Sequence, residues 1–349
     1  MLSEMSTAMK TRPMQPLVER IAELARSHKL SDIHIHSDEP LAMRVHGLIE
    51  MIPDTMISAA EVGAFVESIL DKEQKQTWEK QKDVDLALAH EELRFRVNSY
   101  HTSRGPAVVL RKIETQLPTM EDLHLPQAVI DITQKKNGLV LVTGPTGSGK
   151  STTLAALIDK INGERQDNII TVEDPIEFIH QSKRSLVSQR EVGRDAATFA
   201  TALRAMLRED PDVILVGEMR DLETIALALT AAETGHLVFG TLHTNGAPNS
   251  INRILDVFPP QQQAQARAQL SQSLRLVVTQ RLISRADQPG RVAAFEVMVN
   301  NVATANLIRE NKVFQIEQAM ETGKGQGMMT MKDSIHALKT QGVIAQDVV

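Results

Sequence analysis

The chain has 349 residues and a formal net charge of −6, with 42% hydrophobic residues, 23% charged residues and no cysteine. This composition is that of an ordinary globular protein, and the length suggests two domains. The lack of cysteine excludes disulfides, thiolate zinc sites and a cysteine nucleophile, and it favours a cytoplasmic protein. The negative net charge gives no general attraction to nucleic acid, so we expect no nucleic-acid partner.

The start of the chain does not have the pattern of a signal peptide. Residues 1–14 are rich in methionine and mixed in polarity, without a continuous apolar core, so residues 1–13 are expected to form a loose leader. No segment approaches the roughly 18 apolar residues that a membrane-spanning helix needs. A role at a membrane is therefore expected to run through a partner protein, without direct insertion.

A small α/β domain is predicted for residues 1–114. Helical spacing of apolar residues comes first, at 17–30, and is followed by strand-like alternation at 31–48. A helix near residues 59–70 and strands near 84–89, 93–100 and 107–113 complete the domain, with a turn at 103–106 between the last two strands. Residues 115–126, which carry Pro118 and Pro126, are interpreted as a linker.

The remaining residues, 127–349, are predicted to form a second and larger domain. From Gly138 onward, short apolar runs alternate with helical stretches. Strands that are apolar throughout and separated by helices indicate a parallel sheet covered on both faces. The expected strands of this sheet lie at residues 139–143, 169–172, 213–216 and 237–242.

The strongest local signal of the sequence lies directly after the first of these strands. Residues 144–151 match the GxxxxGK[ST] phosphate-binding loop and precede an apolar helix at 152–161, which is the context that the motif requires. Backbone N–H groups and the helix N-terminus would hold phosphate, Lys150 would reach the β- and γ-phosphates of ATP, and Ser151 would ligate Mg²⁺. The expected nucleotide-binding residues are Gly144, Pro145, Thr146, Gly147, Ser148, Gly149, Lys150, Ser151 and Thr152.

A second candidate residue ends another predicted strand. Residues 213–216 are apolar and lead through Gly217 to Glu218. Ligands gather at the carboxyl ends of parallel strands, so a carboxylate there could polarise water toward a γ-phosphate. An acidic residue that ends a strand is equally often just solvated, and its place after a phosphate-binding loop favours the catalytic interpretation.

Four motifs in order carry a resemblance to a known family. The phosphate-binding loop is followed by Thr-Val-Glu-Asp-Pro-Ile-Glu at 171–177, by Gly217-Glu218 and by a segment from Thr234 to His243. These resemble the aspartate box, the atypical Walker B motif and the histidine box of the type II/IV secretion ATPase superfamily. Residues 202–221 and 231–244 look most like the retraction motors of type IV pili, which power twitching motility. The similarity extends from about residue 17 to 318.

The resemblance implies a RecA-like P-loop NTPase core with a smaller N-terminal PAS-like α/β domain. It assigns Glu218 to the attacking water, and Glu177 and His243 to arranging water and γ-phosphate. By the same resemblance, Arg96 and Arg111 of the small domain are aimed at nucleotide. Pattern alone favours a solvated sheet face for these arginines and a buried structural role for the histidine, and the family resemblance favours the functional interpretation of the arginines.

The same resemblance implies a working assembly. The chain is expected to form a homo-oligomer, a hexameric ring, with nucleotide bound between domains and subunits. ATP hydrolysis would turn an inner-membrane platform protein that removes pilin subunits. Residues 307–312, Leu-Ile-Arg-Glu-Asn-Lys, resemble a signature of retraction motors, although Leu307 replaces the usual alanine.

Three other functions remain open at this point. The first is an extension or secretion motor of the superfamily. Such motors usually carry an extra N-terminal domain and a four-cysteine zinc loop. This sequence begins close to its first predicted element and has no cysteine, so a retraction motor is preferred. A nucleotide-gated scaffold without turnover is a second possibility, which the intact loop and Glu218 disfavour. A DNA-translocating motor is the third, and it is disfavoured because Trp78 and Tyr100 are the only tryptophan and tyrosine available for stacking.

Overall fold

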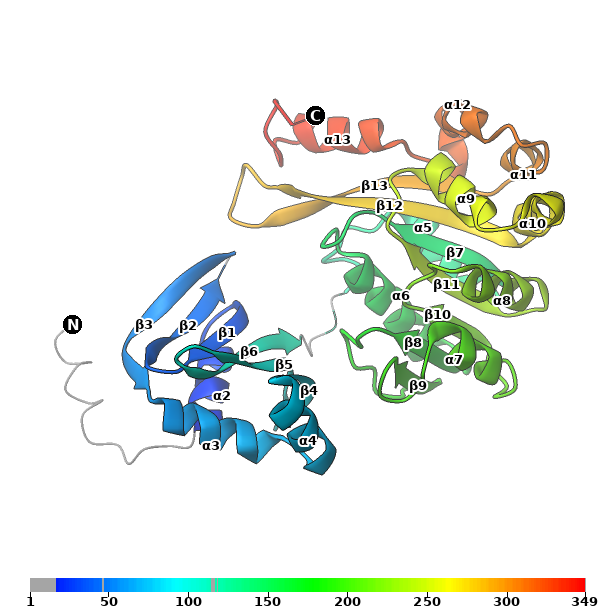
Figure 1. The fold of residues 1–349 in the computed structure, drawn as a ribbon. Coiled ribbons are helices and arrows are strands. Elements are labelled where there is room, and N and C mark those ends of the chain that lie inside the picture. Colours follow the sequence, from blue (N-terminus) through cyan, green and yellow to red (C-terminus); the bar gives the residue numbers. More distant parts are fainter. Residues whose placement is uncertain (1–16, 46, 114–116, 118, 349) are drawn as a thin grey trace. The chain divides into compact units, whose positions relative to one another are not determined.

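The computed structural model describes residues 17–45, 47–113, 117 and 119–348 of the chain. The chain divides into two compact units, Met1–Thr115 and Gln116–Val349, and each unit has a sheet and a hydrophobic core of its own (Figure 1). The leader predicted at residues 1–13 lies outside the described residues.

The N-terminal unit contains one six-stranded antiparallel sheet in the order β3-β2-β1-β6-β5-β4. Three helices accompany this sheet in the described part of the unit (Figure 1). The elements, in chain order, are α2 (Leu17–Ser27), β1 (Leu30–His36), β2 (Glu39–Val45), β3 (Leu48–Ile57), α3 (Ala59–Ile69), α4 (Lys72–Gln81), β4 (Asp83–His90), β5 (Leu93–Thr102) and β6 (Gly105–Ile113).

Alternation along the strands gives this sheet one apolar face and one polar face. Ile33, Phe95 and Leu110 are fully buried and pack with the apolar sides of α2 and α3. The other face carries Arg96 and Arg111, which are paired directly across β5 and β6. The sheet therefore presents both arginines on the same face, opposite its apolar one.

The structure extends the sequence-based description of this unit in three places. Strand β3 and helix α4 were not predicted as separate elements, and the turn between β5 and β6 is shorter than the expected 103–106, because β5 ends at Thr102 and β6 begins at Gly105. A β-hairpin that closes tightly leaves more residues to its strands than the turn signals suggest.

The C-terminal unit contains a seven-stranded sheet in the order β13-β12-β7-β11-β10-β8-β9. All neighbouring strands are parallel except the pair β12 and β13. The strands are β7 (Gly138–Thr143), β8 (Asn168–Glu173), β9 (Leu186–Glu191), β10 (Val213–Val216), β11 (Leu237–Leu242), β12 (Leu274–Ser284) and β13 (Arg291–Val299). All four expected strands are present in the parallel sheet.

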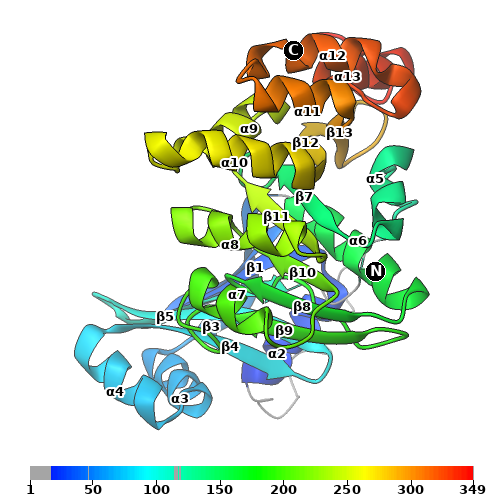
Figure 2. The ribbon, with the colours of Figure 1, turned by 90° about the vertical axis from the view of Figure 1, so that its right-hand side faces the viewer.

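Helices cover both faces of this sheet, as the apolar strands predicted (Figures 1 and 2). One face packs against α6 and α5, and the other packs against α7, α8, α9 and α10. The helices of the unit are α5 (Gln127–Asp131), α6 (Lys150–Glu164), α7 (Phe199–Met206), α8 (Leu222–Glu233), α9 (Ala247–Asp256), α10 (Pro260–Ser273), α11 (Val302–Arg309), α12 (Ile316–Thr322) and α13 (Met331–Thr340), with short 3₁₀ turns η2 (Ile132–Gln134), η3 (Val313–Gln315) and η4 (Lys324–Gln326).

A doubly covered parallel sheet with a phosphate-binding loop after β7 is the RecA-like core that was expected. Long strands β12 and β13 extend it at one edge, and α11 to α13 follow them. Across the described part of the chain, no helix combines the length and the apolar character that crossing a membrane requires.

Candidate functional site

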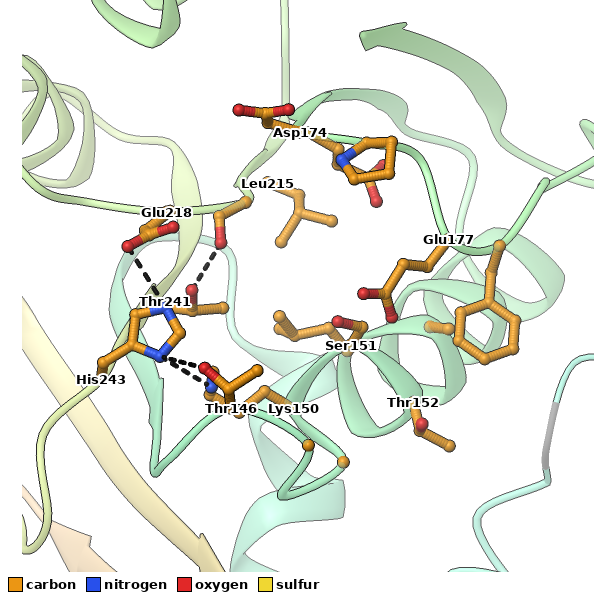
Figure 3. A pocket seen from close by; sticks show the side chains of 18 of the residues that line it. Thr146, Lys150, Ser151, Thr152, Asp174, Glu177, Leu215, Glu218, Thr241 and His243 are labelled. Atoms are coloured by element: carbon orange, nitrogen blue, oxygen red, sulfur yellow. Dashed lines mark hydrogen bonds and ion pairs between the residues drawn. The ribbon is translucent and has the colours of Figure 1, made fainter. Parts of the chain in front are cut away.

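The loops that follow β7, β8, β10 and β11 line one cavity of about 510 Å³ (Figure 3). Parallel strands deliver their carboxyl ends to the same edge of a sheet, so these four loops meet there. The size is within the range of small-ligand sites. Among the lining residues are Lys150, Ser151, Glu177, Glu218 and His243, which brings all three expected catalytic residues of this unit next to the expected phosphate-binding loop.

Glycine is required at both ends of the phosphate-binding loop. Gly144 has φ +135°, and a Cβ atom there would lie 2.4 Å from the backbone oxygen of Gln280. Gly149 has φ +89°, and its Cβ atom would lie 2.8 Å from Nε2 of Gln280. The side chain of Gln280 is buried and accepts a hydrogen bond from Thr153 of α6. Gln280 of β12 thus packs against the phosphate-binding loop and leaves no room for a side chain at Gly144 or Gly149.

Lys150 begins α6 and is almost fully buried. Its Nζ donates hydrogen bonds to the backbone oxygens of Gly144, at 2.8 Å, and Pro145, at 3.1 Å, so the ammonium group lies inside the arch of the loop. Burial lowers the pKa of Lys150, while the charges of Glu218 and Glu177 act in the opposite direction. A cation held in this arch is placed to meet the terminal phosphates of a nucleotide.

Glu218 follows β10 and Gly217, and its side chain is 17% exposed. Its Oε1 accepts hydrogen bonds from Arg220 and from Nε2 of His243, the latter at 3.2 Å. Partial burial alone would raise the pKa of Glu218, but the hydrogen bond and charge of Arg220, together with His243, hold it below its usual value. Glu218 is therefore a carboxylate throughout the physiological pH range.

His243 connects Glu218 with the phosphate-binding loop. While its Nε2 faces Glu218, its Nδ1 lies 3.5 Å from both Thr146 Oγ1 and Lys150 Nζ (Figure 3). It follows β11 at the same edge of the sheet as the loop. His236 precedes the other end of β11 and its Nδ1 lies 2.9 Å from the backbone oxygen of Ala231, far from this chemistry.

The aspartate box forms an acidic loop between β8 and β9. Residues 174–180, called the acidic loop below, begin at a cis Asp174-Pro175 peptide and carry the exposed Glu177, which points into the cavity (Figure 3). Just before this loop, Glu173 is largely buried and accepts a hydrogen bond from Thr171 Oγ1 at 2.7 Å. Burial raises the pKa of the Glu173 carboxyl group.

The cavity fits the phosphates of ATP with Mg²⁺. Among the described residues, the buried Ser148 Oγ has no hydrogen-bond partner, and it lies in the loop that would surround a phosphate. Ser151 and Thr152 line the cavity from the first turn of α6, where Ser151 would ligate Mg²⁺. Within the described part of the chain no three His, Cys, Asp or Glu residues form a metal cluster, so such an ion would depend on Ser151, phosphates and water.

The two expected arginines lie in the N-terminal unit. Arg111 donates from Nε to Oδ1 of the buried Asp32 at 2.9 Å, yet its side chain remains 71% exposed. Burial would raise the pKa of Asp32, but hydrogen bonds from Ser31 and Arg111 lower it. Arg96 is exposed on the adjacent strand, directly opposite Arg111. Both guanidinium groups are therefore available to an anion.

Three residues around the cavity were not predicted from the sequence. Arg220 binds Glu218, Gln280 supports the loop glycines, and Glu173 lies beside Gly217 on the neighbouring strand. Arg220 and Glu173 lie inside segments that the resemblance covered, but no local pattern assigns them a contact. Gln280 lies between Thr279 and Arg281, and no local pattern sets it apart from these polar neighbours.

The chain is similar to known proteins over most of its length. The sequence profile of the family described as Type II/IV secretion system protein matches residues 7–346. A protein named "Twitching motility protein" from Neisseria gonorrhoeae is 51% identical over 306 residues, which cover 87% of this chain and 82% of that protein. The "Type IV pilus retractation ATPase PilT" of Pseudomonas aeruginosa is 47% identical over 318 residues, covering 91% and 92% of the two chains.

A solved structure resembles nearly the whole fold. The crystal structure of the pilus retraction motor PilT with bound ADP superimposes with a TM-score of 0.89 at 44% sequence identity, covering 96% of each chain. A nucleotide-bound relative of this similarity supports nucleotide binding by the present chain.

Glu218→Gln is expected to keep ATP binding and to lose most hydrolysis. The amide preserves shape but removes the charge that orients water, so we expect kcat to fall by about 100-fold or more. ATP turnover and binding of a fluorescent ATP analogue are the measurements, with Lys150→Ala as the control that removes the phosphate-facing cation. Loss of binding together with turnover in Glu218→Gln would instead make the residue structural.

Proposed function

The chain belongs to the Type II/IV secretion system protein family, and we propose that within it the chain is the ATP-hydrolysing motor of type IV pilus retraction. The observation that carries this proposal is the cavity where the phosphate-binding loop, Glu218 and His243 meet. Relatives named for twitching motility and pilus retraction share about half of the aligned residues.

ATP hydrolysis would use the residues of the cavity in distinct roles. The loop backbone and Lys150 hold the β- and γ-phosphates. Glu218 accepts a hydrogen bond from the attacking water and thereby orients it toward the γ-phosphate. His243 contacts both Glu218 and the phosphate-binding loop and so fixes their positions relative to each other. Glu177 approaches the attacking water from the acidic loop on the other side of the cavity.

Mg²⁺ would be held by Ser151, by phosphate oxygens and by water within reach of Glu177 and Glu218. When bound, the ion neutralises charge on the β- and γ-phosphates. The side chains that we assign to it all line the same cavity.

Retraction is preferred to the other functions of the family because of the named relatives. Pilus extension and type II or IV secretion remain the alternative within the family, and a regulatory scaffold without turnover is the alternative outside catalysis. An ionised Glu218 fixed beside a complete phosphate-binding loop favours turnover over a scaffold role.

Deletion of the gene in its own host is expected to leave cells with more pili than normal and unable to twitch. Pili that cannot be withdrawn accumulate on the cell. Counting surface pili by electron microscopy therefore shows whether the motor retracts or extends them. Complementation with the wild-type gene should reverse the phenotype, and complementation with Glu218→Gln should not. Cells without pili would identify an extension motor instead.

We further propose that the chain works as a hexameric ring in which Arg96 and Arg111 act on the nucleotide of a neighbouring subunit. Two fixed guanidinium groups can stabilise charge on a transferring phosphoryl group. Both arginines lie exposed on one sheet face, and neither belongs to the unit that carries the phosphate-binding loop.

Mixed rings test this action between subunits. A subunit with Arg96→Ala and Arg111→Ala retains an intact loop, and a Lys150→Ala subunit retains intact arginines. Mixing two inactive variants is expected to restore part of the ATPase activity, because some interfaces then combine both intact halves. Differently tagged subunits, purified through both tags, supply the control for mixing, and rings that are mixed but inactive would count against the idea.

The segment at residues 307–312 is proposed to contact the inner-membrane platform protein and not the nucleotide. It spans the end of α11: Arg309 is the last residue of the helix, whereas Glu310 and Lys312 follow it and form an ion pair at 2.8 Å. The helix therefore ends before the last two of these charges. All three side chains are exposed, and Phe314 just beyond them is 76% exposed.

Replacing Arg309 and Glu310 by alanine is expected to leave ATP hydrolysis within about twofold of wild type, since surface substitutions change stability by only about 0.5 kcal/mol. The same variant should leave cells with excess pili and no twitching. ATPase assays on the purified protein and stab motility assays on cells are compared, with Lys332→Ala on α13 as the surface control. An equal loss of both activities would place the segment in the catalytic cycle.

A further inference from the structure

Strand β9 is an edge strand of the large sheet, opposite the edge formed by β13, and none of the expected motifs includes it. Its residues Gln189 and Glu191 are two positions apart and therefore share one face of the sheet. In the parallel register with β8, Gln189 lies opposite Thr171 and Glu191 lies opposite Glu173. These two side chains consequently face the acidic loop, which leaves the end of β8.

Gln189 uses both atoms of its amide group on this loop. Its Oε1 accepts the backbone N–H of His180 at 2.8 Å, and its Nε2 donates to the backbone oxygen of Phe178 at 2.9 Å. The same Nε2 lies 3.2 Å from Oε1 of Glu173 and donates to it. One side chain thus joins the start of the acidic loop to its end.

Glu191 supplies the matching contact on the other side of Glu177. Its Oε2 accepts the backbone N–H of Ile176 at 3.1 Å. The residues before and after Glu177 are therefore both hydrogen-bonded to β9 through their backbones, while the Glu177 side chain is free to point into the cavity (Figure 3). A loop residue held on both sides keeps its side chain in a narrow range of positions.

We propose that Gln189 is a positioning residue of the catalytic site, which clamps the acidic loop to β9 and thereby sets the position of Glu177. Gln189 does not line the cavity and acts through the loop backbone. This inference rests on the proposed ATPase function for its kinetic consequence, but the clamp itself is a property of the fold. Small displacements of catalytic groups reduce turnover strongly, and ground-state phosphate binding belongs to the separate loop after β7.

Gln189→Leu removes the amide at similar size, and Ser188→Ala is its matched control, because Ser188 is the exposed neighbour on the opposite face of β9. Hydrogen–deuterium exchange of the full chain without nucleotide measures the clamp. Peptides that cover residues 174–180 should exchange faster in Gln189→Leu and at the wild-type rate in Ser188→Ala, while peptides from α8 stay unchanged in both. Unchanged exchange at 174–180 in Gln189→Leu would overturn the clamp.

Kinetics test what the clamp does for Glu177. Gln189→Leu is expected to lower kcat by about 10- to 100-fold while the KM for ATP changes little. In a Glu177→Ala background, the same substitution should cost less than about twofold, because a residue that acts only through Glu177 has nothing left to position. An equal loss in both backgrounds would overturn the positioning role.

A second variant guards against a simple folding defect. Gln189→Glu keeps the acceptor for His180 but lacks both donors and places a second carboxyl group against Glu173, so it should show the same pattern of exchange and kinetics. Thermal unfolding of each variant identifies any loss of the fold. Failure of the ATPase proposal is distinguished by the wild-type chain: if it does not hydrolyse ATP, the proposed function fails, whereas the exchange result still decides the clamp.

Discussion

The parallel register of β7, β11, β10 and β8 is the constraint on which the site depends. Leu242 pairs with Thr143, and Val216 pairs with both Gly240 and Val172, so the strands end together and their loops enter one cavity. A shift of one residue in any strand would turn its side chains to the opposite face of the sheet. The apolar residues on both faces oppose such a shift, because each is packed against helices.

The same register explains why glycine stands where many P-loop ATPases carry a metal-binding aspartate. A Cβ atom at Gly217 would lie 3.0 Å from the Cα atom of Glu173 and 3.1 Å from the backbone oxygen of Val172. A side chain therefore cannot be added without moving β8. The acidic groups of the site come instead from Glu218, one residue later, and from the acidic loop across the cavity.

The parts of the fold that were predictable are those with local signals. The apolar strands, the phosphate-binding loop and the carboxylate after β10 are readable because each pattern lies within a few consecutive residues. The contacts of Gln189 and Gln280 were not predictable, because each joins segments that only strand pairing brings together. The contact of Arg220 with Glu218 is local, but no sequence pattern marks it. Strand β9 is a clear case, since an edge strand of mixed polarity has no distinctive pattern.

The carboxyl groups of the site are differentiated by their surroundings and not by their residue type. Arg220 and His243 lower the pKa of Glu218, whereas burial raises that of Glu173, where Thr171 and Gln189 are the donors. A group whose charged form is favoured can orient water, while a buried carboxyl group beside other acids is favoured in its neutral form. The Glu218 carboxylate is also the one that His243 links to Lys150, so the group that we assign to water and the cation that we assign to phosphate are connected through a single imidazole ring. The different surroundings agree with the two roles that we assign, Glu173 to the structure beside the acidic loop and Glu218 to the chemistry.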